Sequence, residues 1–222
     1  MSASIIRPLI LKDLYLLRPM MIGALAFGGF GIALMPFGET PFFVGWILLF
    51  IATVLLGIFI TAVGVVTERK DRVHLFVLTL PTSPAQYTAA KLAASAIAFL
   101  VPWAILLSTA LALIATTGIP DGLMPFLAAL LFYALCYYSL YLAVALVTDS
   151  VMWSTLVIIV GNTIPVFLIP ALFRMPGVSA DPDPSGPVWT ANVLTVLACE
   201  VAFSAAAVGF ALYLRSRQRD FI

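Results

Sequence analysis

Charged side chains are scarce in this chain. Lys, Arg, Asp and Glu make up 9% of its 222 residues, whereas 63% of the residues are hydrophobic. An ordinary soluble domain carries about a quarter charged residues. A soluble fold could not cover this much apolar surface, so the composition predicts an integral membrane protein.

The groups on which most enzymes depend are also missing. The chain has one histidine and two cysteines, with no cluster at metal-ligand spacing. It has neither a Gly-x-Ser-x-Gly elbow nor a Gly-x-x-x-x-Gly-Lys-[Ser/Thr] phosphate loop. We therefore expect no catalytic residue, no metal site and no cofactor on this chain. With no tract of basic residues, nucleic acid is not expected as a partner.

Long runs without a charged residue are abundant. A helix needs about 20 mainly apolar residues to cross about 30 Å of hydrocarbon. Six runs meet this requirement, at residues 20–37, 42–66, 92–117, 123–148, 150–173 and 193–214. The predicted fold class is all-α, an integral membrane six-helix bundle that forms a single transmembrane domain over residues 1–222. The glycines at 28, 29 and 31 lie inside the first span and are interpreted as sites of close helix packing.

The positions of Lys and Arg predict the orientation, because cytoplasmic loops are enriched in both. With six spans, Arg174 alone falls on the outer side. The basic residues on the other side are Arg7, Lys12, Arg18, Arg69, Lys70, Arg72, Lys91, Arg215, Arg217 and Arg219. Both termini are therefore assigned to the cytoplasm, and the protein to the inner (plasma) membrane as a multi-pass protein.

Two segments outside the spans have a distinct character. Residues 1–19 place apolar side chains at helical spacing opposite charged ones, which is the pattern of a helix lying in the membrane interface. Pro8 and Pro19 mark this segment off. We therefore predict a separate interfacial elbow helix, the alternative being a cytoplasmic extension of the first span. Residues 174–192 are rich in Pro and Gly and predict an outer loop.

The most informative segment is the cytoplasmic stretch 67–91. Thr67 is placed to cap a short helix with Glu68 and Asp71 in its first turn, and Pro81 ends that helix. Helical spacing makes one apolar stripe of Val73, Phe76, Val77 and Leu80. A short amphipathic helix at a bend must bury this stripe against lipid, against its own bundle or against another protein. The residues alone do not choose among the three.

Polar side chains inside the spans identify candidate pathway or gate residues. Glu200 lies about eight residues into the sixth span, and a carboxylate at such depth by default indicates function. Pairing with Arg174, or protonation with a hydrogen bond to Ser or Thr, would satisfy it structurally instead. Asn162 lies near Pro165 in the fifth span, which predicts a bent outer half, and a gate there, with freed carbonyls that need partners.

Tyrosines repeat along one face of the fourth span. Tyr133, Tyr137 and Tyr141 stand at i, i+4 and i+8. Their hydroxyls need partners at mid-membrane, so this face is predicted to point into the protein. Packing is the favoured role of these side chains, and Tyr137 is retained as a candidate pathway residue beside Asn162 and Glu200.

The segments around the second span resemble a known family. A basic amphipathic segment at residues 11–18 precedes two spans, Glu68-Arg69-Lys70 follows them, and Leu-Pro-Thr-Ser at 80–83 precedes Lys91. With six spans, an outer loop before the last span and a basic carboxyl tail, the chain resembles the ABC type-2 permeases over essentially its whole length.

This resemblance implies the permease subunit of an ABC exporter, which moves an amphipathic or hydrophobic substrate outward through the lipid membrane. Such a subunit pairs with a second copy of itself or a related permease and with a separate ATP-binding cassette ATPase. ATP and Mg would bind to that ATPase, so the chain itself is not expected to be an enzyme. The segment after span two would be the coupling helix. Its expected ATPase contacts are Glu68, Arg69, Arg72, Val73, Phe76, Val77 and Leu80.

Two other functions agree with the same composition. One is an ion-coupled secondary transporter that uses Glu200. Such transporters usually carry internal helix repeats, and no convincing repeat is found here. The other is a membrane anchor that transports nothing and holds a cytoplasmic partner.

Overall fold

The computed structural model describes residues 3–67, 84–148, 150–176, 178 and 189–217. In these residues the chain forms helices and short connections. The elements are α1 (Ala3–Leu34), the 3-10 turn η1 (Met35–Phe37), α2 (Glu39–Thr61), the π-helical turn η2 (Ala62–Thr67), α5 (Pro84–Thr116), α6 (Leu123–Val147), α7 (Val151–Thr163), α8 (Pro165–Leu172) and α9 (Ala191–Arg217).

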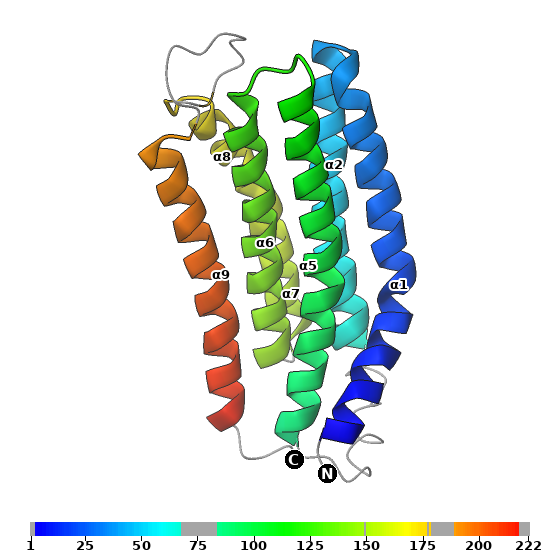
Figure 1. Cartoon of the computed structure of the whole chain (residues 1–222). Coiled ribbons are helices and arrows are strands. Elements are labelled where there is room, and N and C mark those ends of the chain that lie inside the picture. The colour runs from blue at the N-terminus through cyan, green and yellow to red at the C-terminus, as the bar shows by residue number, and fades with distance from the viewer. Residues whose placement is uncertain (1–2, 68–83, 149, 177, 179–188, 218–222) are drawn as a thin grey trace.

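The predicted all-helical membrane fold is confirmed. Within the described ranges, six stretches are long and apolar enough to cross a membrane: Arg7–Phe37, Glu39–Gly64, Ala89–Thr116, Leu123–Val147, Met152–Leu172 and Ala191–Leu214. Each predicted span falls largely within one of these stretches. The beginning of α1 and the end of α9 lie at the same end of the bundle, as an even number of crossings requires (Figure 1).

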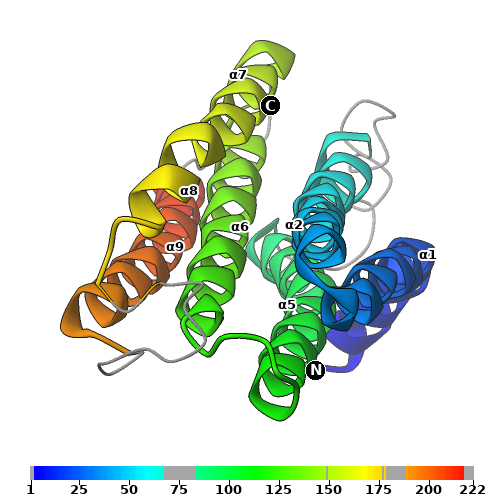
Figure 2. The same cartoon turned by 90° about the horizontal axis from the view of Figure 1, so that it is seen from above.

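Helix α6 is the centre of the bundle. Seen from above, it lies between a group made of α1, α2 and α5 and a second group made of α7, α8 and α9 (Figure 2). About two thirds of its apolar window (67%) is buried, against 11% for α9. The indole nitrogen of Trp103 on α5 donates a hydrogen bond to the Leu131 carbonyl of α6 at 2.8 Å. Helices α7 and α9 pack chiefly on α6 and leave most of their surface open.

Close contact between α1 and α2 depends on two glycines. A Cβ atom at Gly31 would lie 2.6 Å from the Gly45 carbonyl oxygen, so no larger residue fits between the two backbones. This confirms the packing role predicted for Gly31. A Cβ at Gly29 would meet no neighbouring atom, so that glycine has no such role in this chain. Because glycine has no side chain, α1 and α2 approach closely and gain dispersion contacts. Such contacts drive the association of helices in lipid.

The separate elbow helix predicted for residues 1–19 is not seen. Helix α1 runs without a break from Ala3 to Leu34 with Pro8 and Pro19 inside it. Each proline removes one backbone hydrogen bond, but neighbouring helices make such a loss tolerable in a membrane helix. The amino-terminal half of α1 packs on α5, and its Leu17 side chain is only 1% exposed. Packing along α5 keeps the segment in line with the span.

Two helices are longer than predicted. Helix α5 begins at Pro84 rather than at residue 92, because Ala89, Ala90 and the residues around them continue the helical pattern of the span. Helix α9 continues to Arg217, beyond residue 214. The coupling helix predicted after Thr67 lies outside the described residues, and so does most of the outer loop at 174–192.

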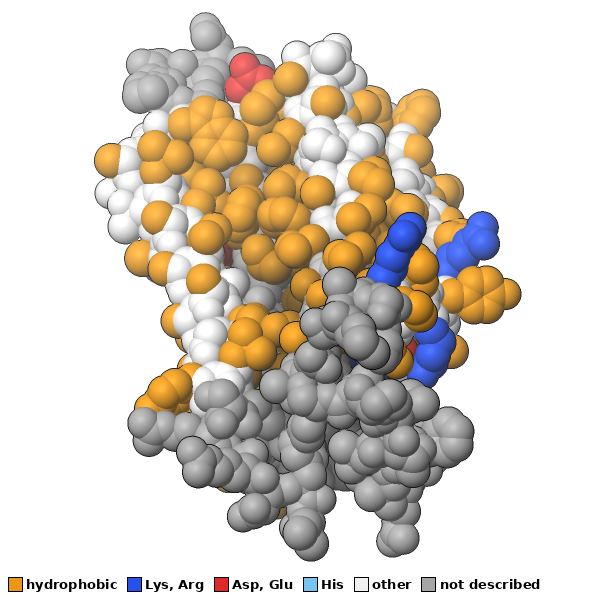
Figure 3. Space-filling view, turned by 60° about the horizontal axis from the view of Figure 1, so that its bottom comes forward, with side chains coloured by type: hydrophobic (Ala, Val, Ile, Leu, Met, Phe, Trp, Pro, Cys, Tyr) orange, Lys and Arg blue, Asp and Glu red, His pale blue; other side chains and the backbone are white. Residues whose placement is uncertain are grey.

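Apolar side chains spread over the flank of the bundle, and Lys and Arg gather beside α1 near the end where the termini lie (Figure 3). The arrangement of the first three spans can be tested by labelling. Single cysteines at Arg7 and at Gly118, in a chain whose Cys136 and Cys199 are replaced, should react with an impermeant maleimide from opposite sides of the membrane. Arg7 is exposed near the start of α1, and Gly118 is exposed in the connection after α5. Labelling of both positions from one side would contradict the six-span arrangement.

Candidate functional site

Polar residues of three helices meet near the middle of the bundle. Tyr133 lies ten residues into α6 and Glu200 nine residues into α9, while Asn162 lies ten residues from the start of the Met152–Leu172 span. At 1.5 Å per residue, each is about 14–15 Å from an end of its helix. The three residues therefore occupy one level, half-way across the hydrocarbon.

The tyrosine face of α6 points into the protein, as predicted. Tyr137 and Tyr141 are each 4% exposed, and Tyr133 is 9% exposed. Tyr133 and Tyr137 pack with Val54 of α2, and Leu168 of α8 lies against the same group. This cluster joins the central helix to both the second and the fifth spans.

The fifth span is interrupted, as predicted, and one backbone carbonyl is affected by the interruption. In a continuous helix the Gly161 carbonyl would accept a hydrogen bond from the backbone N–H of residue 165, which is a proline and has none. The carbonyl accepts instead from the Tyr133 hydroxyl of α6. On either side the backbone bonding continues, with Ile164 N–H donating to Val160 at 3.1 Å and Leu168 N–H donating to Ile164 at 3.0 Å.

The structure brings together two of the predicted gate residues. The side-chain amide of Asn162 donates to the Tyr137 hydroxyl at 3.3 Å and to the Ile158 carbonyl at 2.8 Å. Beside it, a Cβ at Gly161 would overlap the ring of Tyr137, so only glycine admits that ring. Asn162 itself is exposed at the surface of the chain, although it lies at mid-membrane depth.

Glu200 occupies a different place, between α6 and α9. Its backbone carbonyl accepts from the Cys136 thiol at 3.0 Å and from the Ser204 hydroxyl at 2.9 Å. In the part of the chain that is described, no donor bonds its buried Oε2 atom, so the suggested pairing with Arg174 is not found for this oxygen. Glu200 therefore shares the level of Tyr133 and Asn162, but it is not hydrogen bonded to them through this atom.

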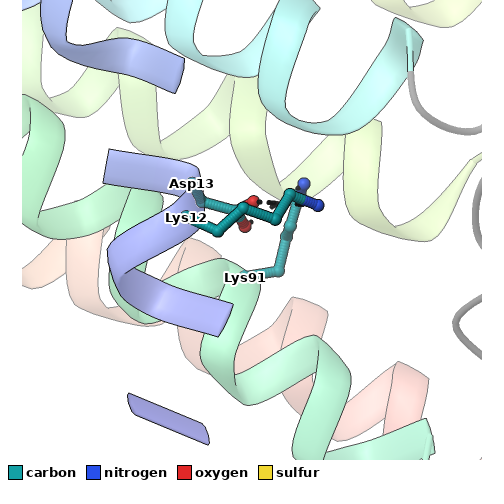
Figure 4. A network of polar contacts seen from close by, with 3 residues as sticks. All are labelled: Lys12, Asp13 and Lys91. Atoms are coloured by element: carbon teal, nitrogen blue, oxygen red, sulfur yellow. Dashed lines mark ion pairs between the residues drawn. The ribbon is translucent and has the colours of Figure 1, made fainter. Parts of the chain in front are cut away.

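A buried ion pair joins α1 and α5 at the end of the bundle where the chain begins. Lys91 Nζ lies 3.3 Å from Asp13 Oδ2, and these side chains are only 7% and 10% exposed. Lys12 lies 3.7 Å from the other carboxylate oxygen and is 55% exposed (Figure 4). The pair holds α1 against α5 at the last residue of the predicted cytoplasmic stretch 67–91.

Sequence reasoning missed this pair and the role of Gly161. Asp13 and Lys91 belong to helices far apart in the sequence, and nothing local marks them as partners. A signal for Gly161 does exist, because the residue four positions before a proline always loses its helical partner. The identity of the replacement donor depends on how α6 packs, which the sequence pattern does not give.

The predicted ATPase contacts at 68–80 lie outside the described residues: Glu68, Arg69, Arg72, Val73, Phe76, Val77 and Leu80. In the described chain, η2 precedes these residues and the first turn of α5 follows them. The π-helical turn η2 contacts α1, α5 and α6. Single π turns inside helices are rare and often accompany functional sites.

The ion pair permits a prediction about stability. Replacing Asp13 with Asn should lower the free energy of unfolding by up to about 3–5 kcal/mol, because the buried Lys91 ammonium then loses the charge of the Asp13 carboxylate. Replacing both residues, as Asp13→Leu with Lys91→Met, should cost much less. The thermal unfolding midpoint in detergent measures both effects.

The control is Lys12→Met, which removes a mainly exposed charge near the same carboxylate and should change the stability by less than about 1 kcal/mol. Equal midpoints for this variant and Asp13→Asn would show that the buried pair contributes nothing beyond an exposed contact.

Comparison with known proteins assigns the family. The family described as ABC-2 family transporter protein matches residues 37–211. Neither a curated protein nor a solved structure shows a significant match. The matched range begins in η1 and continues almost to the end of α9, so it includes the central helix, the interrupted fifth span and the polar level at mid-membrane. The chain therefore belongs to the ABC-2 transporter family and is a multi-pass membrane permease of the ABC type.

Proposed function

We propose that the chain is the transmembrane subunit of an ABC exporter. The observation that carries this proposal is the family match over residues 37–211, which coincides with a bundle of six apolar helices. The sequence has no Walker-type phosphate loop. ATP and Mg are therefore assigned to a separate ATP-binding cassette subunit, and this chain contributes the path across the membrane.

The proposed orientation of the chain rests on the distribution of charge. Basic side chains lie at the end of the bundle where α1 begins and α9 ends. Because cytoplasmic loops are enriched in Lys and Arg, this end is proposed to be cytoplasmic. In this proposal the chain lies in the inner membrane, with the ATPase on its cytoplasmic side. The substrate is amphipathic or hydrophobic and moves outward, past walls that are mostly apolar.

The coupling segment after η2 is the proposed ATPase contact. The described residues on either side of it are packed in the bundle, since η2 touches three helices and α5 is joined to α1 through Lys91 and Asp13. We propose that a push on this segment is transmitted to those helices. Movement of the ATPase would therefore reach α1, α2 and α5 together.

A second copy of this chain, or a related permease, completes the proposed pathway. Helices α7, α8 and α9 are open on the sides that face away from α6. Asn162 and Thr163 are exposed there at mid-membrane depth, where polar groups in contact with lipid are costly. A partner subunit or a polar passage at this surface removes that cost. Asn162, Tyr137 and Glu200 are the proposed pathway or gate residues.

The coupling role is tested at Phe76. Replacing Phe76 with Ala should remove the aromatic anchor of the ATPase contact and weaken association by about 2 kcal/mol or more, roughly 30-fold in affinity. The bundle should remain folded, and hydrolysis should no longer respond to substrate. Co-purification with a candidate ATP-binding cassette ATPase, followed by an ATPase assay in lipid, measures both results.

Phe59→Ala is the matched control, because Phe59 is a half-exposed residue of α2 within the span. It should affect neither association nor hydrolysis. If Phe76→Ala also behaves as the unmodified protein, the stripe faces lipid or the bundle, and the coupling role must lie elsewhere on the cytoplasmic surface.

The secondary transporter remains the second candidate because Glu200 has a buried oxygen without a donor. In the exporter, Glu200→Gln should keep most of the transport, since Gln retains hydrogen bonding without the charge. Glu200→Leu should lower transport about tenfold, because it removes the polar oxygens that this residue would offer to the proposed pathway. ATP-dependent uptake into inverted vesicles measures this, with Cys199→Leu, an exposed neighbour on α9, as the control. Transport that needs a proton gradient and proceeds without ATP would contradict the exporter.

A further inference from the structure

We propose that Tyr133 is the positioning residue for the outer half of the fifth span. Its hydroxyl replaces the backbone N–H that Pro165 lacks, and it thereby fixes how α8 leaves α7. The effect of this residue on export rests on the proposed function, whereas its effect on α8 does not.

The hydrogen bonding around the interruption isolates one acceptor. The Val160 carbonyl receives the Ile164 N–H, and the Ile164 carbonyl receives the Leu168 N–H. The Gly161 carbonyl lies between these bonds and has lost its helical donor to Pro165. Gly161 and Pro165 are both buried, so water does not reach this carbonyl from the surface. An unpaired carbonyl at that depth is destabilising, and Tyr133 supplies the missing donor.

The packing around Gly161 holds this part of α7 in one position on α6. The Tyr137 ring occupies the space where a Cβ of residue 161 would stand, and the Tyr137 hydroxyl accepts from Asn162. The two tyrosines lie one helical turn apart on α6, so they hold consecutive residues of α7. The carboxyl-terminal end of α7 is therefore fixed on α6, and this fixes the position of the base of α8, where that helix begins.

The far end of α8 is held by apolar contacts. Leu172 is 1% exposed, and the ring of Phe173 stacks on Phe126 of α6 with centroids 4.6 Å apart. On the opposite side Val166 and Phe167 are 65% and 72% exposed. Helix α8 thus has a packed tip, an open outer side and a base where the carbonyl that Pro165 leaves without a helical donor is bonded to Tyr133. Loss of that bond releases the base while the tip contacts remain.

The consequence for export is a change in coupling. The ATPase acts on the cytoplasmic end of the bundle, and the outer end must move in step for substrate to leave. When the base of α8 is loose, movement of α6 is not passed on to α8. Hydrolysis then continues, but each ATP moves less substrate.

The test uses Tyr133→Phe, which removes only the hydroxyl. Tyr138→Phe is the matched control, because Tyr138 lies on the same helix, is 4% exposed, and its hydroxyl has no partner in the described chain. Hydrogen–deuterium exchange of the purified protein in lipid nanodiscs should rise about fivefold or more for peptides covering residues 162–173 in Tyr133→Phe. It should stay unchanged in Tyr138→Phe and in peptides of α5.

A double-mutant cycle separates this role from general loss of stability. Pro165→Ala restores an N–H to residue 165, which can bond the Gly161 carbonyl directly. In that background, Tyr133→Phe should no longer raise exchange, because the carbonyl has its own donor. An effect of Tyr133→Phe that is equally large in the Pro165→Ala background would overturn the proposal, and so would exchange at the unmodified level in Tyr133→Phe itself.

Export is measured in proteoliposomes containing the permease and its ATPase, as substrate moved per ATP hydrolysed. Tyr133→Phe should lower this ratio about fivefold while hydrolysis stays within about twofold of the unmodified protein. An unchanged ratio would overturn the role in coupling. If the unmodified protein shows no ATP-dependent transport, the proposed function fails. The exchange experiment still tests whether Tyr133 positions α8.

Discussion

Every backbone N–H and C=O group that lies in hydrocarbon must find its partner inside the protein, and the rest of this structure depends on that constraint. It explains why the described chain is helical and why α1 can contain two prolines only where neighbouring helices support it. It also explains why a single proline in the fifth span determines a contact with another helix. The Gly161 carbonyl loses its partner, and α6 provides a hydroxyl at the same depth. A break in one helix thus becomes a specific attachment to the next.

The features that sequence reasoning predicted are those that depend on one segment at a time. Six charge-free runs identify six spans because crossing the hydrocarbon requires a minimum length and excludes charge. Pro165 identifies the break in the fifth span, and the spacing of Tyr133, Tyr137 and Tyr141 identifies the inward face of α6. The separate interfacial helix predicted for residues 1–19 is not seen, because a proline stops a helix only when nothing else supports the chain around it.

The features that sequence reasoning missed depend on two segments at once. Asp13 and Lys91 are each ordinary charged residues near a span, and only the packing of α1 on α5 makes them a buried pair. The spacing of the tyrosines predicts that Tyr133 is buried, but it does not reveal that Tyr133 donates a hydrogen bond. Its acceptor is a backbone atom, which has no signature in the sequence. Glu200 was found by its charge alone, and its backbone contacts with Cys136 and Ser204 were not foreseeable. A residue pattern along one helix describes that helix and does not identify the residues of another helix that it contacts.

The central place of α6 has a consequence for the order in which the chain assembles. Helices α1, α2 and α5 all contact one another, so they can pack as soon as the third span has left the ribosome and entered the membrane. Helices α7 and α9 pack chiefly on α6, which is synthesised before either of them. Biosynthesis therefore delivers a stable three-helix platform first, then the helix that joins the two groups, and last the helices that depend on it. A nascent chain truncated before α6 would keep its first group, whereas one that lacked α6 would leave the last spans without a place to dock.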